Sequence, residues 1–179
     1  MRDLSTAFGA IRVRWYLFGA QAAILYGAAR LTADVDVSVE LGEQPTRLLV
    51  EALAAKGFAL RVTDSEDFVE RTRVLPVVHE RSRIPVDVVL TGPGIEELFL
   101  DRVEMHSIEG IATPVASPDD IVAMKLLAGR RKDLEDASAI VAAAGKNFDR
   151  QRAEETLRLL EQALDRSDLA TELGRLFDA

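Results

Sequence analysis

Apolar and polar residues alternate along one short segment of the chain, and a second segment is a mostly apolar run; both are typical of β-strands. Residues 34–41 read Asp-Val-Asp-Val-Ser-Val-Glu-Leu, with an apolar residue at every second position. Residues 84–90 read Ile-Pro-Val-Asp-Val-Val-Leu. Because successive side chains of a strand point to opposite faces of a sheet, we expect Val35, Val37 and Val39 to face the core and the acids to face the other side.

The other apolar segments predict a mixture of helices and strands. Helices are expected near residues 3–11, 20–28, 45–56 and 95–101, and strands near 15–18, 34–41, 58–63, 69–79 and 84–90, with extended pieces around 103–116. Ser-Pro-Asp-Asp at 117–120 is typical of a helix start, because Ser caps the helix and Pro suits its first position. The chain is expected to be helical from there almost to its end.

These elements indicate an α/β (α+β) fold in which helices flank a small mixed β-sheet. We expect a core domain over residues 1–116 and a C-terminal helical region over residues 117–179 that packs on it. The length of 179 residues suits one domain with such an addition.

Composition excludes several classes of protein. The chain has no cysteine, which excludes disulfides, Cys-ligated zinc and a thiol nucleophile. No apolar run approaches the ~20 residues of a membrane helix, and the charged N-terminal segment is unlike a secretory signal. We therefore expect a cytoplasmic protein with no membrane partner. The net charge of −8 argues against general coating of nucleic acid, but it allows an RNA acceptor that docks on a local patch.

Four arginines flank the apolar residues 74–78, at positions 71, 73, 81 and 83. The four lie in two extended-looking segments, and alternation would place Arg71 and Arg73 on one face, near Arg81 and Arg83. Two interpretations stay open: solvated charges that protect an edge strand from aggregation, or a contact for a phosphate-rich partner.

Three aspartates are the candidates for metal binding and catalysis. Asp34 and Asp36 share one face of their expected strand, and Asp87 lies inside a second strand. If the two strands are neighbours, three carboxylates converge, and carboxylate oxygens are the ligands that Mg²⁺ prefers. The alternative is a polar face that is merely solvated, as in many antiparallel sheets. Aspartate is depleted in strands, which favours a functional role.

A candidate phosphate-binding turn precedes the first two aspartates. Gly19, Ala20 and Gln21 follow a short apolar strand and begin a helix, where free backbone N–H groups form a ready anion site. Arg30 and Thr32 lie on the connection to Asp34 and could meet phosphate oxygens. The alternative is an ordinary strand-turn-helix connection.

The first motif of nucleotidyltransferases of the DNA-polymerase-β superfamily resembles this region. The similar residues are Phe-Gly-Ala at 18–20 and Gly-Ala-Ala-Arg-Leu-Thr-Ala-Asp-Val-Asp-Val at 27–37. The subgroup that the chain looks most like is that of the AbiEii-like abortive-infection toxins, whose later motif resembles residues 125–136. One departure is Ala20, where the family usually has a second glycine or a serine. Its backbone N–H is kept, so phosphate binding stays feasible.

The resemblance implies a mechanism and further site residues. A nucleoside triphosphate (NTP) would be the substrate, two Mg²⁺ ions would be held by Asp34, Asp36 and Asp87, and a nucleoside monophosphate would move to an acceptor hydroxyl. Lys125, Lys132 and Asp133 would also bind or support the nucleotide; read from the residues alone, Lys125 could snorkel along the core edge and Lys132 could pair with Asp136 on the surface.

The resemblance also implies partners but leaves the acceptor open. A toxin-type enzyme would modify tRNA or a protein and would have a cognate antitoxin. The alternatives are an antibiotic-modifying nucleotidyltransferase, a catalytically decayed nucleotide-binding module, and a purely structural interaction domain.

Overall fold

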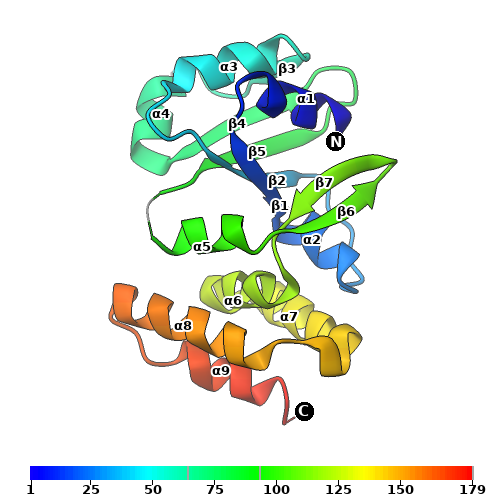
Figure 1. Cartoon of the computed structure of the whole chain (residues 1–179), viewed down its shortest axis with the longest axis vertical. Coiled ribbons are helices and arrows are strands. Elements are labelled where there is room, and N and C mark those ends of the chain that lie inside the picture. The colour runs from blue at the N-terminus through cyan, green and yellow to red at the C-terminus, as the bar shows by residue number, and fades with distance from the viewer. Residues whose placement is uncertain (64, 93, 179) are drawn as a thin grey trace. The chain divides into compact units, whose positions relative to one another are not determined.

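The computed structural model describes residues 1–63, 65–92 and 94–178 (Figure 1). The chain divides into two compact units. The first unit contains residues 1–21 and 32–115, and the second contains residues 22–31 and 116–179.

A single mixed sheet organises the first unit. Within the described residues it has seven strands: β1 (Arg14–Phe18), β2 (Val35–Glu40), β3 (Phe58–Leu60), β4 (Val74–His79), β5 (Pro85–Leu90), β6 (Glu104–Ile108) and β7 (Ile111–Val115), in the order β3-β4-β5-β2-β1-β7-β6. The pairs β2–β5 and β1–β7 are parallel, and the other pairs are antiparallel. The expectation of a mixed sheet with flanking helices is confirmed.

Helices and one apolar face of the sheet form the core of the first unit. The helices are α1 (Arg2–Ala10), α3 (Thr46–Ala54), α4 (Ser65–Thr72) and α5 (Ile95–Asp101), with α2 (Gly19–Leu25) beginning in this unit. Val37 and Val39 are fully buried, as the alternation predicts. On the same face, the Phe8 ring of α1 lies 5.1 Å from the Trp15 ring of β1. Burial of these side chains against the helices stabilises this unit.

The second unit is helical. It contains the rest of α2 together with α6 (Pro118–Ala128), α7 (Arg131–Ala144), the 3-10 turn η1 (Gly145–Asn147), α8 (Arg150–Leu164) and α9 (Leu169–Arg175). The predicted cap is present: the Asp120 N–H donates to the Ser117 hydroxyl at 3.3 Å. Gly27 has φ of +105°, and a Cβ there would lie 2.6 Å from the Ala143 Cβ. Glycine thus lets the residues after α2 pack closely against α7.

The structure corrects the predicted strand over residues 69–79. Residues 65–72 form α4, and β4 begins only at Val74. Glu66 and Asp67 lie in the first turn of α4 and Arg71 in the last, which suits the helix dipole. Asp67 and Arg71 also form an i,i+4 ion pair of 3.1 Å. These local helix signals outweigh the apolar residues that extend the strand pattern.

The predicted arginine face is wrong for the same reason. Arg71 lies on α4, whereas Arg73 follows the helix and donates to the Leu90 carbonyl at 2.6 Å. Arg81 lies 3.5 Å from Asp3, and Arg83 adopts a left-handed turn conformation. The arginines therefore belong to different local structures and do not alternate along one strand.

In the part of the chain that the structure describes, every helix is too short or too polar to span a lipid bilayer.

Candidate active site

Asp36 and Asp87 lie side by side on neighbouring parallel strands. The register of β2 and β5 pairs Asp36 with Asp87, and on the other side of β2 it pairs Asp36 with Phe18 of β1. Residues in register on neighbouring strands project from the same face, and the strands are ~4.8 Å apart. The two carboxylates therefore share one face, opposite to the face that Val37 contributes to the core.

Gly19 lies directly beneath the Asp36 carboxylate. Its backbone is left-handed, with φ of +68°, and a Cβ at this position would lie 2.7 Å from the Asp36 Cγ. Any other residue would need both an unfavourable backbone conformation and a displaced carboxylate. Ala20 is buried and Gln21 is half-buried. Because Gly19 lies against Asp36, the predicted phosphate-binding turn and Asp36 are neighbours in the first unit.

Asp34 precedes β2 by one residue and is exposed. The Thr32 hydroxyl donates a short hydrogen bond to its carboxylate. Thr32 therefore holds the acid, and this hydroxyl has a partner within the chain.

The polar face of β2 is not simply solvated. Ser38, two residues after Asp36, is buried, and its hydroxyl lies 3.0 Å from that of Thr91. Farther along, Arg14 binds Glu40 at 2.7 Å. The hydrogen bond from Arg14 is the main cause that lowers the pKa of Glu40. The interpretation of this face as solvent-facing decoration therefore does not describe the buried Ser38.

Arg61 is a residue of this face that the sequence pattern does not reveal. It follows β3 and forms an ion pair with the Asp87 carboxylate, through one guanidinium nitrogen and the single oxygen Oδ1. Among the described residues, Asp87 has no other side-chain partner. The only available signal is the pairing of strands, because Arg61 follows the edge strand β3 and is separated from β5 by β4.

The donor set at this face fits a hard divalent cation. Asp36 and Asp87 supply carboxylate oxygens from one sheet face, and the missing Cβ of Gly19 makes the room that the Asp36 carboxylate occupies. Among residues 1–63, 65–92 and 94–178, however, no three acidic or histidine side chains are gathered closely enough to hold a metal ion. Asp87 is engaged by Arg61 and Asp34 by Thr32, so both side chains are directed by protein partners.

A buried charge cluster occupies the second unit. The Lys125 ammonium lies 3.1 Å from Asp133 and 2.7 Å from Asp136, and all three side chains are buried. Lys125 therefore does not snorkel, because its charge is neutralised inside the unit. Asp136, predicted from the sequence only as a surface partner of Lys132, is instead central to this cluster.

Two arginines complete the cluster. Arg30 donates to Asp136 at 2.9 Å, and Arg130 donates to Asp133 at 2.5 Å. Burial alone would raise the pKa of Asp133, but hydrogen bonds from Arg130 and Lys125 outweigh it and lower the pKa. Three cations thus surround the carboxylates of Asp133 and Asp136.

Lys132 is exposed on α7 and takes no part in this cluster.

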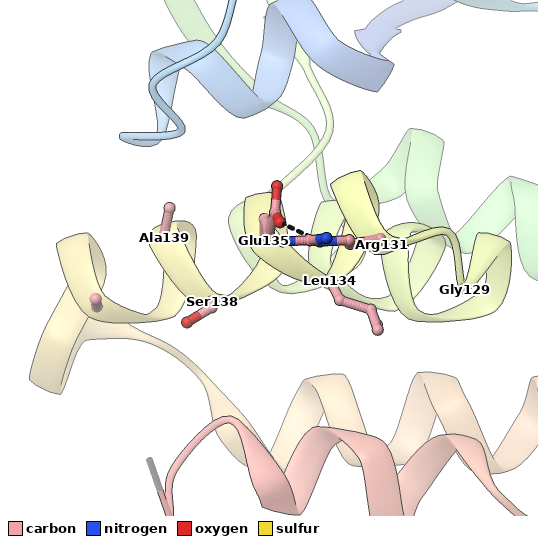
Figure 2. A pocket seen from close by; sticks show the side chains of 7 residues that line it. Gly129, Arg131, Leu134, Glu135, Ser138 and Ala139 are labelled. Atoms are coloured by element: carbon pink, nitrogen blue, oxygen red, sulfur yellow. Dashed lines mark hydrogen bonds and ion pairs between the residues drawn. The ribbon is translucent and has the colours of Figure 1, made fainter.

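A shallow hollow of about 760 Å³ also lies along α7 (Figure 2). It is lined by Gly129, Arg131, Leu134, Glu135, Ser138, Ala139 and Ala142. In it Arg131 and Glu135 pair at 3.0 Å. None of the predicted nucleotide-binding residues lines this hollow.

The fold defines a class of protein. Over 92% of this chain and 90% of the other, the structure resembles the antibiotic-resistance factor ANT(2'')-Ia, with a TM-score of 0.59 and 12% identity. An antigenic nucleotidyltransferase-like protein from Paracoccidioides brasiliensis has a TM-score of 0.55 and 18% identity, over 96% of this chain and 91% of the other. The lincosamide antibiotic adenylyltransferase LnuA has a TM-score of 0.52 and 15% identity, over 76% of this chain and 90% of the other. The fold is that of nucleotidyltransferases.

The sequence identifies the family. Residues 2–178 match the family model described as nucleotidyl transferase AbiEii toxin, type IV toxin–antitoxin system. The chain therefore belongs to the AbiEii family and is a nucleotidyltransferase, as the resemblance of its first motif indicates. A comparison with curated proteins gives no match.

Proposed function

We propose that the chain is a Mg²⁺-dependent, toxin-type enzyme that transfers a nucleoside monophosphate from an NTP to a hydroxyl group of tRNA or of a protein. The observation that carries the proposal is the register of Asp36 with Asp87 beside Gly19. Two carboxylates next to the first turn of a helix, whose N–H groups have no partner within the helix, suit the binding of a metal–triphosphate complex.

Each candidate site residue at the Asp36 face of the sheet has a role in this proposal. The backbone N–H groups of Gly19, Ala20 and Gln21 bind the phosphates. Asp34, Asp36 and Asp87 are the ligands of two Mg²⁺ ions, which, when bound, supply Lewis-acid activation and charge neutralisation. Metal binding by Asp34 requires its carboxylate to reorient from Thr32, whereas Asp87 can keep the Oδ1 contact with Arg61 and offer Oδ2.

Asp87 also accepts the proton of the acceptor hydroxyl. The acceptor oxygen then forms a bond to the α-phosphorus, the bond from the α-phosphorus to the bridging oxygen breaks, and pyrophosphate leaves with that electron pair. The residues work mainly by positioning and by neutralising charge.

The second unit contributes cations in this proposal. Lys125 uses two of its three N–H donors on Asp133 and Asp136, which leaves one for a phosphate oxygen. Arg30, whose side chain is 25% exposed, is more accessible than Lys125, whose side chain is 8% exposed. Thr32 and exposed Lys132 stay candidate nucleotide ligands, and Asp133 acts by holding Lys125.

Family membership supports a toxin-type acceptor and an antitoxin that counters the enzyme. The net charge of −8 supports an acceptor that docks locally and does not coat the surface. We therefore propose that the acceptor is tRNA or a protein and that the enzyme acts in the cytoplasm.

Labelling of separated acceptor pools tests the proposal. The purified chain is incubated with each of the four α-labelled NTPs and Mg²⁺, in parallel with tRNA, a protein extract and a panel of aminoglycoside and lincosamide antibiotics. The expected result is label in tRNA or protein that disappears when EDTA is added. Label only in the antibiotics would favour a resistance-type enzyme. Mg²⁺-dependent NTP binding without any label would favour a decayed binding module.

A further inference from the structure

A row of residues in register crosses four strands of the sheet on the Asp36 face and leads to the residue that follows β3. Asp36 is in register with Phe18 on one side and with Asp87 on the other, and Asp87 is in register with Pro76 of β4. The row continues to Arg61, whose N–H donates to the Pro76 carbonyl at 2.9 Å. Since residues in register share a face, Arg61 projects on the same side as both aspartates.

Pro76 explains why β3 ends at Leu60, just before Arg61. An antiparallel pair of this kind normally exchanges two backbone hydrogen bonds. Proline has no N–H, so Pro76 accepts from Arg61 but returns no bond. The strand β3 ends at Leu60, although the sequence predicts it to continue to residue 63. The short proline ring also lets the Arg61 side chain pass over β4 to Asp87.

The contact between Arg61 and Asp87 is suited to orienting the carboxylate. Arg61 binds only Oδ1, so Oδ2 is left for a cation or a proton. Both side chains are 36% exposed, and an ion pair so exposed to water adds little to folding stability. The ion pair matters more for geometry than for stability. It fixes the rotation of the Asp87 carboxylate, which has no other side-chain partner among the described residues.

We propose that Arg61 is a positioning residue that orients Asp87 for proton transfer from the acceptor hydroxyl. This inference rests on the proposed function, in which Asp87 accepts that proton. It assigns to an edge-strand arginine an effect on turnover without direct contact with the triphosphate.

Steady-state kinetics of Arg61→Ala and Arg61→Lys test the role in turnover, with Arg81→Ala as the matched control because Arg81 is 85% exposed and pairs only weakly with Asp3. A misoriented base should lower kcat of Arg61→Ala by about 10- to 100-fold while KM for the NTP stays within about 2-fold. Arg61→Lys should recover part of the loss, since lysine restores the charge but not the planar fork. Millimolar guanidinium should also restore activity to Arg61→Ala. Wild-type kcat in Arg61→Ala, or a loss confined to KM, overturns the inference.

A carboxylate resonance separates this inference from the proposed function. In protein labelled with carbon-13 at aspartate, the Asp87 signal is assigned by its absence in Asp87→Asn. It should move in Arg61→Ala and stay in place in Arg81→Ala. Absence of transfer by the wild-type protein would refute the proposed function alone. An Asp87 signal with the same chemical shift in Arg61→Ala as in the wild type would refute the ion pair and the positioning role with it.

Discussion

The Asp36 carboxylate packs against the Cα of Gly19, with no room for a side chain between them. This contact joins the turn that begins α2 to the strand that carries the acid. It also explains why glycine is required at residue 19 for two separate reasons, a left-handed φ of +68° and the proximity of Asp36.

Gly19→Ala should therefore damage activity more than stability. The added methyl group must displace the Asp36 carboxylate, and a displacement of about 1 Å at a reacting group costs about 100-fold in rate. Gly57→Ala is the matched control, because Gly57 has φ of +80° but open space where a Cβ would lie. Both variants should lose about 1 kcal/mol of unfolding free energy from the backbone strain. Equal activities of the two variants in the labelling assay would contradict the importance of the Asp36 contact.

Asp136→Asn should destabilise the second unit. The substitution removes the negative charge that Lys125 and Arg30 share, and breaking a buried pair in this way costs about 3 kcal/mol. Glu135→Gln is the control on the same helix, because Glu135 pairs with Arg131 on the exposed surface. Its effect should stay within about 0.5 kcal/mol. Urea unfolding measures the free energy of unfolding of both variants. Similar losses in the two would show that the buried cluster stabilises the protein no more than the exposed Arg131–Glu135 pair does.

Asp119 should make stability depend on pH. Burial is the main cause that raises its pKa from 3.8 to about 6, against the opposing contacts from the Asp149 N–H and Arg152. A raised pKa means that the folded state binds the proton more tightly. The stabilisation is complete below about pH 3.8 and is lost as the pH rises through 6.

Asp119→Asn should remove this dependence, because asparagine still accepts the Asp149 N–H bond of 3.0 Å but does not ionise. Relative to wild type, the variant should gain stability between pH 4 and 7.5, by at most about 3 kcal/mol. Glu155→Gln, at an exposed position of α8, should show no such trend. A difference between Asp119→Asn and wild type that is constant across this pH range would contradict the prediction.

Local patterns predict much of this fold. The alternation at 34–41 correctly identifies the buried valines, and Ser117 caps a helix as its sequence context indicates. Residues 65–72 are misread, since Phe68 and Val69 extend the apolar pattern of β4 while the acids and Arg71 around them favour a helix. β3 is shorter than its apolar residues suggest, because Pro76 on the neighbouring strand lacks the N–H that would extend it.

The candidate site shows the same division. Gly19 and Asp36 are visible in the sequence because they lie in one motif, and Asp87 is visible as an acid within a strand. Arg61 and Asp136 escape notice because their roles depend on register and on helix packing. Neither relationship is encoded by residue spacing along the chain.

The most direct measurement is nucleotide transfer by Asp36→Asn beside Asp101→Asn, whose carboxylate pairs with Arg14 on an exposed surface of the same unit. Asparagine keeps the size of Asp36 but removes its charge, so Asp36→Asn should fold normally by circular dichroism. It should lose at least about 100-fold of Mg²⁺-dependent transfer, whereas Asp101→Asn should match the wild type. Transfer by Asp36→Asn at the rate of Asp101→Asn would contradict the assignment of this sheet face as the active site.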